Sequence, residues 1–385
     1  MIRHAFFLAW RYLLSAKGRS VILILGTSTA LFLPLFSYLG AEIIQQKLTS
    51  RAQNSPILIG QKGNEFDLTM NSLYFRGKIK DPLPLSEQKK LSKYGLSVPI
   101  YVNHSASQSP VVGTSLSYFR ARQLDIKEGR QFAVLGEVVA GAAVAEDFAL
   151  KVGDTIRSDM QNLYNIAGSY PMLLPVVGIL EPTNTADDQA FFVDVKTAWT
   201  LDGHLHGHDA VTRENAVNAE ASEGENLEAT AAIFIFPEIN EKNRDSFHFH
   251  GSVDGLPISA VLVLPKDQKA HDQILGEYVL SEHYQAVRPL EVVMTILELL
   301  LGLQKALNAY FFVVACSTAA FFALALSLSL RLRATELELM RRIGGSKSVI
   351  FLMVLAELFL IVSFSVMVSL AETLLGLSLI QHFVL

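Results

Sequence analysis

Five of the ten histidines fall in two short runs that could bind a metal ion. The first run is His-x-His-x-His at His204, His206 and His208, and the second is His-x-His at His248 and His250. Alternate residues of an extended chain project to one face, so each run would align its imidazoles. Imidazole nitrogens are ligands for Zn²⁺, Cu²⁺ and Ni²⁺. The pattern predicts a metal site, with zinc as the first choice; the alternative is an exposed histidine-rich loop without specific binding.

The segment around these histidines is polar and acidic. Between residues 203 and 230, six acidic residues stand against one basic residue, Arg213. A segment of this composition can bury little apolar surface, so we expect a mobile acidic insertion at residues 200–250. Three further histidines, His104, His271 and His283, are isolated in the sequence and are expected to lie on the surface.

One carboxylate, Glu357, falls within an apolar run near the end of the sequence. Residues 348–385 contain only two acidic residues, Glu357 and Glu372. An ionisable side chain inside a bilayer is costly, and it is functional by default. The alternative is a structural carboxylate, protonated or paired with an arginine, that holds helices together. We favour this structural role.

The sequence contains no recognisable catalytic motif, such as a nucleophile elbow or His-Glu-x-x-His. Gly344-Gly345-Ser346-Lys347-Ser348 superficially resembles a phosphate-binding loop but lacks the required Gly-Lys pair. Cys316 is the one cysteine, which excludes a disulfide framework and a thiolate zinc site. No basic block with interleaved aromatic residues indicates nucleic-acid binding. We therefore expect neither an enzyme nor a nucleic-acid-binding protein.

The chain that must position these side chains is unusually apolar. Of its 385 residues, 50% are hydrophobic and 18% are charged, and its net charge is −5. A typical soluble domain has about 25% charged residues. Val21–Gly40 and Ala306–Leu330 contain no charged residue. Because about 20 apolar residues cross a bilayer, a purely soluble protein is excluded.

The distribution of basic residues predicts the topology, because lysine and arginine flank membrane spans on the cytoplasmic side. Four basic residues precede Val21, and five more fall in residues 331–347. Both segments are therefore expected in the cytoplasm, with residues 43–288 on the outer side. The last apolar stretch has 38 residues, whereas two spans and a turn need at least about 40. We expect three complete spans and a fourth that is missing or partial.

The predicted fold is an α-helical membrane domain with a large mixed α/β extracytoplasmic domain on helical stalks. Its parts are a basic cytoplasmic N-terminus (1–20), span one (21–42), the extracytoplasmic domain (43–288), a stalk with span two (289–330), a cytoplasmic coupling loop (331–347), span three (348–371) and the start of a fourth span or a C-terminal remnant (372–385). A continuous helix over 290–330 would be about 61 Å long, about twice the thickness of the hydrocarbon core.

Short apolar and helical patterns alternate in the extracytoplasmic domain. β-type runs occur at 56–60, 97–102, 138–140, 173–180, 231–236 and 258–264. Helical patterns occur at 86–94, 141–150 and 266–280. This alternation predicts a mixed α/β domain.

Residues 331–357 resemble the cytoplasmic coupling region of the MacB/LolC/FtsX-like permease family of ABC transporters. In that family, span two ends in basic residues and is followed by a short acidic–basic helix, a turn with glycine, and a span with a glutamate. The matching residues here are Arg331, Arg333, Glu336, Glu338, Arg341, Arg342, Gly344, Gly345 and Glu357. The resemblance implies that Glu336, Glu338, Arg341, Arg342, Gly344 and Gly345 couple the chain to an ATPase, and that Glu357 lies within the membrane.

The extracytoplasmic region resembles the same family. It contains a Gly-Arg turn at Gly129, a strand with an alanine-rich helix at 137–150, Val-Gly-Asp at 152–154 and Val-Gly-Ile at 177–179, in the family's order. The acidic insertion at about 200–250 shows no family pattern.

The resemblance implies a non-enzymatic permease subunit in the bacterial inner membrane. It implies a cytoplasmic ATPase dimer that carries ATP and Mg²⁺, and a second permease copy that completes a homodimer. The subunit would transmit ATP-driven motion to its periplasmic domain, with a substrate at the outer face or with a periplasmic partner or binding protein. The alternative is an FtsX-like regulator that relays this motion to an external partner such as a cell-wall hydrolase, or that senses a metal.

Overall fold

The computed structural model describes residues 2–160, 171–207, 236, 238–249, 251–344 and 346–383. The chain divides into two compact units. The helical unit comprises Met1–Gln46 and Ile296–Leu385, and the mixed unit comprises Lys47–Thr295. Two helices, α2 (Lys17–Gln53) and α9 (Pro289–Leu332), are continuous across the division.

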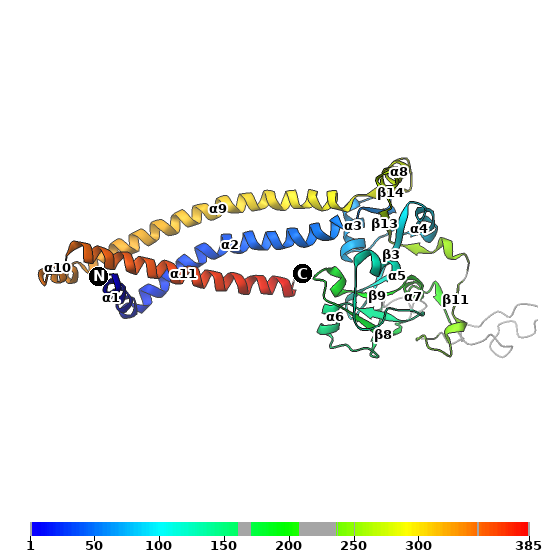
Figure 1. Cartoon of the computed structure of the whole chain (residues 1–385), viewed down its shortest axis with the longest axis horizontal. Helices are drawn as coiled ribbons and strands as arrows, with labels where there is room; N and C mark the ends of the chain where they lie inside the picture. Colours follow the sequence, from blue (N-terminus) through cyan, green and yellow to red (C-terminus); the bar gives the residue numbers. More distant parts are fainter. Residues whose placement is uncertain are drawn as a thin grey trace, which may run out of the picture. The chain divides into compact units, whose positions relative to one another are not determined.

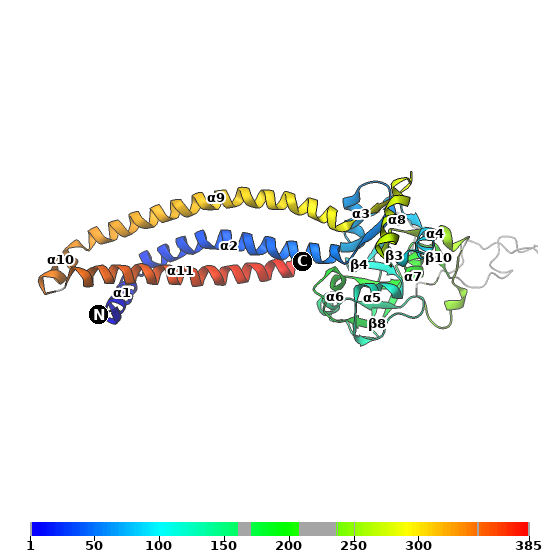
Figure 2. The same cartoon turned by 45° about the horizontal axis from the view of Figure 1, so that its top comes forward.

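Three helices are long and apolar enough to cross a membrane, namely α2, α9 and α11 (Lys347–Phe383). Within the helical unit they run side by side in both views (Figures 1 and 2). The uninterrupted α9 agrees with the continuous helix expected over 290–330. The boundaries of the spans and their number stay predictions.

Two further helices complete this unit, α1 (Ile2–Ser15) and α10 (Ala334–Arg342). One side of α1 packs against α11, where Phe6 meets Phe359 edge to face and Trp10 stacks on Phe364. These aromatic pairs fix α1 against α11.

Small residues bring α11 close to α2. The Ser365 hydroxyl donates to the carbonyl of Ile24 at 3.2 Å, and a Cβ at Gly376 would lie 2.7 Å from the Phe36 ring. Contacts of this kind hold apolar helices together where no hydrophobic effect is available.

The mixed unit is built on a ten-stranded sheet with the order β14-β1-β13-β3-β4-β9-β6-β8-β5, and β7 pairs with β8. Its strands are β1 (Ile57–Gln61), β3 (Gly95–Ala106), β4 (Ser109–Thr114), β5 (Ile126–Gly129), β6 (Val138–Ala140), β7 (Thr155–Arg157), β8 (Leu173–Leu180), β9 (Phe191–Asp194), β13 (Ala260–Pro265) and β14 (Tyr284–Val287). Two small sheets pair β2 (Leu83–Pro84) with β12 (Pro257–Ile258) and β10 (Leu205–His206) with β11 (His248–Phe249).

Helices cover both faces of this sheet. They are α3 (Glu65–Tyr74), α4 (Leu85–Leu91), α5 (Leu116–Arg122), α6 (Ala142–Asp147), α7 (Val195–Leu201) and α8 (Gln268–Val279). Alternate strand residues enter two separate cores: Phe191 and Val193 pack with Trp199 of α7, and Phe192 packs with Tyr118 and Phe119 of α5. A sheet that is buried on both faces needs nearly continuous apolar strands, and Phe191–Val193 is such a run.

The entry and exit strands of the mixed unit are neighbours. β1 begins shortly after α2 ends, and β14 ends just before α9 begins. The two strands pair antiparallel, with Leu58 opposite Val287 and Gln61 opposite Tyr284. The chain therefore enters and leaves the unit at the same end of one strand pair.

The Gly-Arg and Val-Gly-Ile segments meet in the structure. Gly129 and Gly178 lie opposite each other in the pair β5–β8. Gly129 has φ +78°, and a Cβ there would lie 2.2 Å from the Val177 carbonyl oxygen. The Arg130 guanidinium that follows forms an ion pair with Glu137. The two segments thus form one tight crossing.

The mixed α/β class predicted for this region is confirmed, although several elements were not predicted. Among the residues that the structure describes, the expected runs correspond to β1, β3, β6, β8, β13, α4, α6 and α8. The run at 231–236 falls almost wholly outside the described residues. The strands β4 and β9 and the short helices α5 and α7 were missed.

Candidate coupling site

The short helix α10 presents the predicted coupling residues outward. One residue separates α10 from the end of α9, and none of the residues of α10 is buried. The side chains of Glu336, Glu338 and Arg342 are 71%, 59% and 74% exposed, and Arg341 is also exposed. Glu338 and Arg342 approach each other at 3.4 Å, a surface contact that contributes little to stability. These charges are therefore free to meet a partner protein.

The turn after α10 requires a left-handed backbone. Gly344 has φ +103°, and a Cβ there would meet no other atom. Glycine adopts this conformation without the steric cost that a Cβ brings. Gly345, the second glycine expected in this turn, lies outside the described residues.

Glu357 lies on α11 and accepts hydrogen bonds from two arginines. Its Oε1 is 3.0 Å from Nη2 of Arg19, and its Oε2 is 2.9 Å from Nη1 of Arg333. The Glu357 side chain is 3% exposed. Tyr12 of α1 also joins this cluster: its hydroxyl accepts from Arg19 at 2.8 Å, and its ring centroid is 3.2 Å from Cζ of Arg333. Of the two structural forms considered for Glu357, protonated or arginine-paired, the structure contains the arginine-paired one.

Arg333 connects this cluster to the beginning of α10. It is the N-cap residue of α10 and stands between α9 and α10. Arg19 lies in the first turn of α2 and also donates to the Ser329 hydroxyl of α9. One carboxylate therefore connects the start of α10 to α2 and α11. Removal of one partner from a buried ion pair typically costs about 3–5 kcal/mol.

A second buried ion pair, in the mixed unit, fixes the last turn of α2. Arg51 forms a bidentate pair with Asp187 at 2.6 and 3.0 Å, and it also donates to the Leu73 carbonyl, to the Tyr118 hydroxyl and to the Thr185 hydroxyl. Burial opposes ionisation of Asp187, but the charge and hydrogen bonds of Arg51 hold the pKa of this carboxyl below its usual range. The pair therefore stays ionised and anchors α2 in this unit.

The two histidine runs are brought together only in part. The backbone of His206 in β10 lies opposite that of His248 in β11 in an antiparallel pair. His204 is exposed, and His208 and His250 lie outside the described residues. Within the described part of the chain, no group of three or more metal-ligating side chains gathers. Two imidazoles do not complete the four ligands of a structural zinc ion, so zinc binding stays a prediction.

The neighbouring residues His104 and Asp202 correct one expectation. His104 is buried rather than on the surface, and its Nε2 lies 2.7 Å from Asp202. Asp202 also accepts from Tyr101 and from Asn103. Burial opposes ionisation, but these hydrogen bonds, led by that of His104, lower the pKa of Asp202. Asp202 thus connects His104, Tyr101 and Asn103 in one hydrogen-bonded group.

Sequence reasoning located Glu357 but not its partners, nor the pair of Arg51 and Asp187. Arg19 was interpreted only as a topology determinant, and Arg333 as a topology determinant and one of the basic residues that end span two. The residues that could have indicated the second pair are a lone arginine after a long apolar helix and the Asp-Asp segment at 187–188.

Comparison with known proteins gives one match to a family model. Residues 41–234, about half of the chain, match the MacB-like periplasmic core domain. Among solved structures, the chain is similar to the periplasmic region of MacB from Actinobacillus actinomycetemcomitans, with 13% identity, 65% of this chain and 98% of that chain covered, and a TM-score of 0.35. It is also similar to the extracellular domain of the noncanonic ABC-type transporter YknZ from Gram-positive bacteria, with 13% identity, 60% and 98% covered, and a TM-score of 0.31. A search of curated proteins found no match.

Proposed function

Because this chain belongs to the MacB/FtsX-like family, which is marked by a MacB-like periplasmic core domain, we propose that it is the permease subunit of an ABC transporter. The observation that carries the proposal is the presence of that domain in one chain with α10, an exposed charged helix between two long apolar helices. Such a helix suits a cytoplasmic partner, whereas the domain suits the opposite side of the membrane.

In this proposal, ATP is bound and hydrolysed by a separate cytoplasmic ATPase, and this chain carries no catalytic residue. The ATPase contacts Glu336, Glu338, Arg341 and Arg342 of α10. Its movement passes from α10 through Arg333 to Glu357, and from there to α2 and α11. Two copies of the chain in the bacterial inner membrane then move their periplasmic domains together, which exports, extracts or handles a substrate at the outer face.

The test is affinity purification of the full chain from native membranes, followed by measurement of ATPase activity. We expect a stoichiometric ATPase subunit. In Glu336→Lys, co-purification and ATPase coupling should fall at least several-fold, because a charge at the contact is reversed. The matched control is Asp272→Lys, an equally exposed position on α8, which should behave like the unmodified protein.

The composition of the purified complex distinguishes the two functions considered. An ATPase without an external enzyme supports transport, whereas a cell-wall hydrolase in the complex assigns a regulatory role. Absence of an ATPase in a preparation whose periplasmic domain is folded would contradict both. Metal analysis of the same material, with His206→Ala/His248→Ala beside His283→Ala, tests whether zinc is bound.

A further inference from the structure

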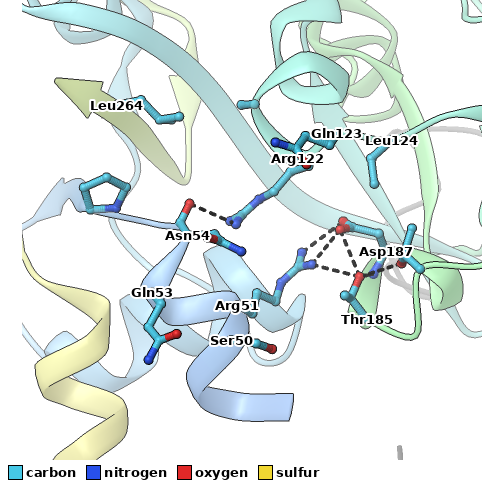
Figure 3. Close-up of a pocket in the computed structure, with 13 residues that line it drawn as sticks. Ser50, Arg51, Gln53, Asn54, Arg122, Gln123, Leu124, Thr185, Asp187 and Leu264 are labelled. Carbon is cyan, nitrogen blue, oxygen red and sulfur yellow. Dashed lines mark hydrogen bonds and ion pairs between the residues drawn. The ribbon is translucent and has the colours of Figure 1, made fainter. Parts of the chain in front are cut away.

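A polar cavity of about 440 Å³ lies where α2 ends in the mixed unit (Figure 3). This volume is typical of small-molecule sites, which measure about 300–1,000 Å³. The last turns of α2, the end of α5 and the segment 183–187 supply its polar lining. The residues are Ser50, Arg51, Gln53, Asn54, Arg122, Gln123, Thr183, Thr185 and Asp187.

The two arginines of the cavity differ in how their donors are used. In Figure 3, Arg51 points toward Asp187, whereas Arg122 reaches toward Asn54. Arg51 has acceptors for all three of its nitrogens. Arg122 makes one long hydrogen bond, from Nη1 to the Asn54 carbonyl at 3.5 Å, and its Cζ lies 5.8 Å from the centroid of the Tyr118 ring. Its Nε and Nη2 are shielded from water and have no hydrogen-bond partner among the residues that the structure describes.

Arg122 is therefore the less fully engaged of the two arginines in the cavity. Burial lowers the pKa of its guanidinium, and Asp187, the one carboxylate in the lining, is already engaged by Arg51 and Tyr118. The orphaned Nε and Nη2 form the edge of a guanidinium that matches two oxygens of an oxyanion. A phosphate group offers further oxygens beside these two, and nine of the thirteen residues that line the cavity are polar.

We propose that this cavity binds a phosphate or phosphoester group, held by the Nε and Nη2 edge of Arg122. The bound oxyanion draws the guanidinium away from its long contact with Asn54 and gives both orphaned donors their acceptors. The competing role is that Arg122 only caps the carboxyl end of α2, where a cation is favourable. Capping of α2 requires only a positive charge at position 122. Phosphate binding requires the two donors Nε and Nη2 of the guanidinium.

The first test measures thermal unfolding of the full chain in detergent, with inorganic phosphate or with chloride at equal ionic strength. We expect phosphate, and not chloride, to raise the Tm of the unmodified protein, since a ligand of the folded state stabilises it. The increase should disappear in Arg122→Gln and persist in Arg120→Gln, an exposed arginine on the same helix. If Arg122→Gln does not fold, Arg122→Lys keeps the cap and should bind phosphate at least about tenfold more weakly.

The second test separates free phosphate from a lipid headgroup. The chain is reconstituted in phosphate-free nanodiscs of phosphatidylglycerol or phosphatidylcholine, and its Tm is measured again. An Arg122-dependent increase in phosphatidylglycerol alone identifies a lipid headgroup, and an increase with inorganic phosphate identifies a free phosphate compound. Equal effects on the unmodified protein and on Arg122→Gln in both tests would overturn the proposal and leave Arg122 as a cap.

Discussion

Glu357 illustrates how single side chains place charge inside the apolar part of this protein. Its carboxylate lies between Arg19 and Arg333, which gives the cluster a net charge of one positive unit. Burial of the carboxylate is tolerated because both guanidiniums pair with it. The Tyr12 ring lies against the two guanidiniums. These contacts favour a role for Glu357 in positioning α10, which remains a prediction.

Replacement of Glu357 by glutamine should strongly lower the Tm of the detergent-solubilised chain, because two guanidiniums then face each other without a counter-charge. The cost is expected at about 3–5 kcal/mol. In Glu357→Gln/Arg333→Gln the original net charge returns, so part of the loss should be recovered. Strictly additive losses in the double variant would contradict the ion-pair role. Glu372→Gln, an acid of the same helix, is the control and should have a small effect.

The ion pair of Glu137 with Arg130 predicts that the stability of the mixed unit falls at acidic pH. Its carboxylate accepts from Arg130 and from the backbone N–H groups of Ala133 and Val134, and the hydrogen bond of Arg130 lowers its pKa from 4.5 to about 2. A carboxyl with a lowered folded-state pKa stabilises the protein above pH ~4.5 and loses this contribution as the pH falls toward about 2.

The measurement is the Tm of the unmodified chain and of Glu137→Gln from neutral pH to about pH 3. The difference between the two proteins should shrink as the pH falls. Glu128→Gln, an exposed neighbour on β5, should show no such convergence. A difference that stays constant over this range would show that the charge of Glu137 contributes nothing.

At the scale of elements, the turn between α10 and α11 depends on glycine. Gly344→Ala places a Cβ on a residue with φ +103°, at a cost on the order of 1–3 kcal/mol. The turn should relax, and the angle at which α10 leaves the membrane helices should change. We expect reduced stimulation of the ATPase with little change in the amount of folded protein. Gly302→Ala, within α9 and free of neighbours, is the matched control and should leave activity unchanged.

The long elements were predictable from the sequence, whereas only some of the short ones, such as α4, α6 and β6, were. α9 and α11 are apolar over many turns, so their composition alone marks them. The helices α5 and α7 have seven residues each, too few to show a helical period. Strand β4 (SPVVGT) contains a proline and a glycine, and its burial between β3 and β9 makes it a strand. Pairing across the sheet therefore overrides local propensity here.

The candidate site was predictable to the same limited extent. The exposed charges of α10 follow from a local pattern of residues. The partners of Glu357 do not, because Arg19 lies 338 positions away in the chain. Such contacts are set by helix packing, on which the spacing of residues along the chain carries no information.

For the whole molecule, α2 and α9 are the two helices that belong to both units. The carboxyl end of α2 is held in the mixed unit by Arg51 and Asp187. This ion pair and the hydrogen bond from the Tyr74 hydroxyl to the Leu48 carbonyl fix the last turns of α2 in the mixed unit.

Arg51→Gln should destabilise the full chain by about 3–5 kcal/mol, because Asp187 is left buried without its cation. The Tm in detergent measures this loss, and Arg76→Gln, at an exposed position, should have little effect. In Arg51→Gln/Asp187→Asn the losses should be less than additive. A double variant as damaged as the sum of the two single variants would exclude direct coupling between the residues.

The pairing of β1 with β14 has a mechanical consequence. A force that separates α2 from α9 acts at one end of this strand pair. It breaks the hydrogen bonds between the strands one after another, beginning near Leu58 and Val287. A pull that draws both helices in the same direction loads the two strands together and leaves their ladder unstrained. If α2 and α9 transmit force to this domain, as the proposed function requires, the pair of β1 and β14 resists that force best when both helices move in the same direction.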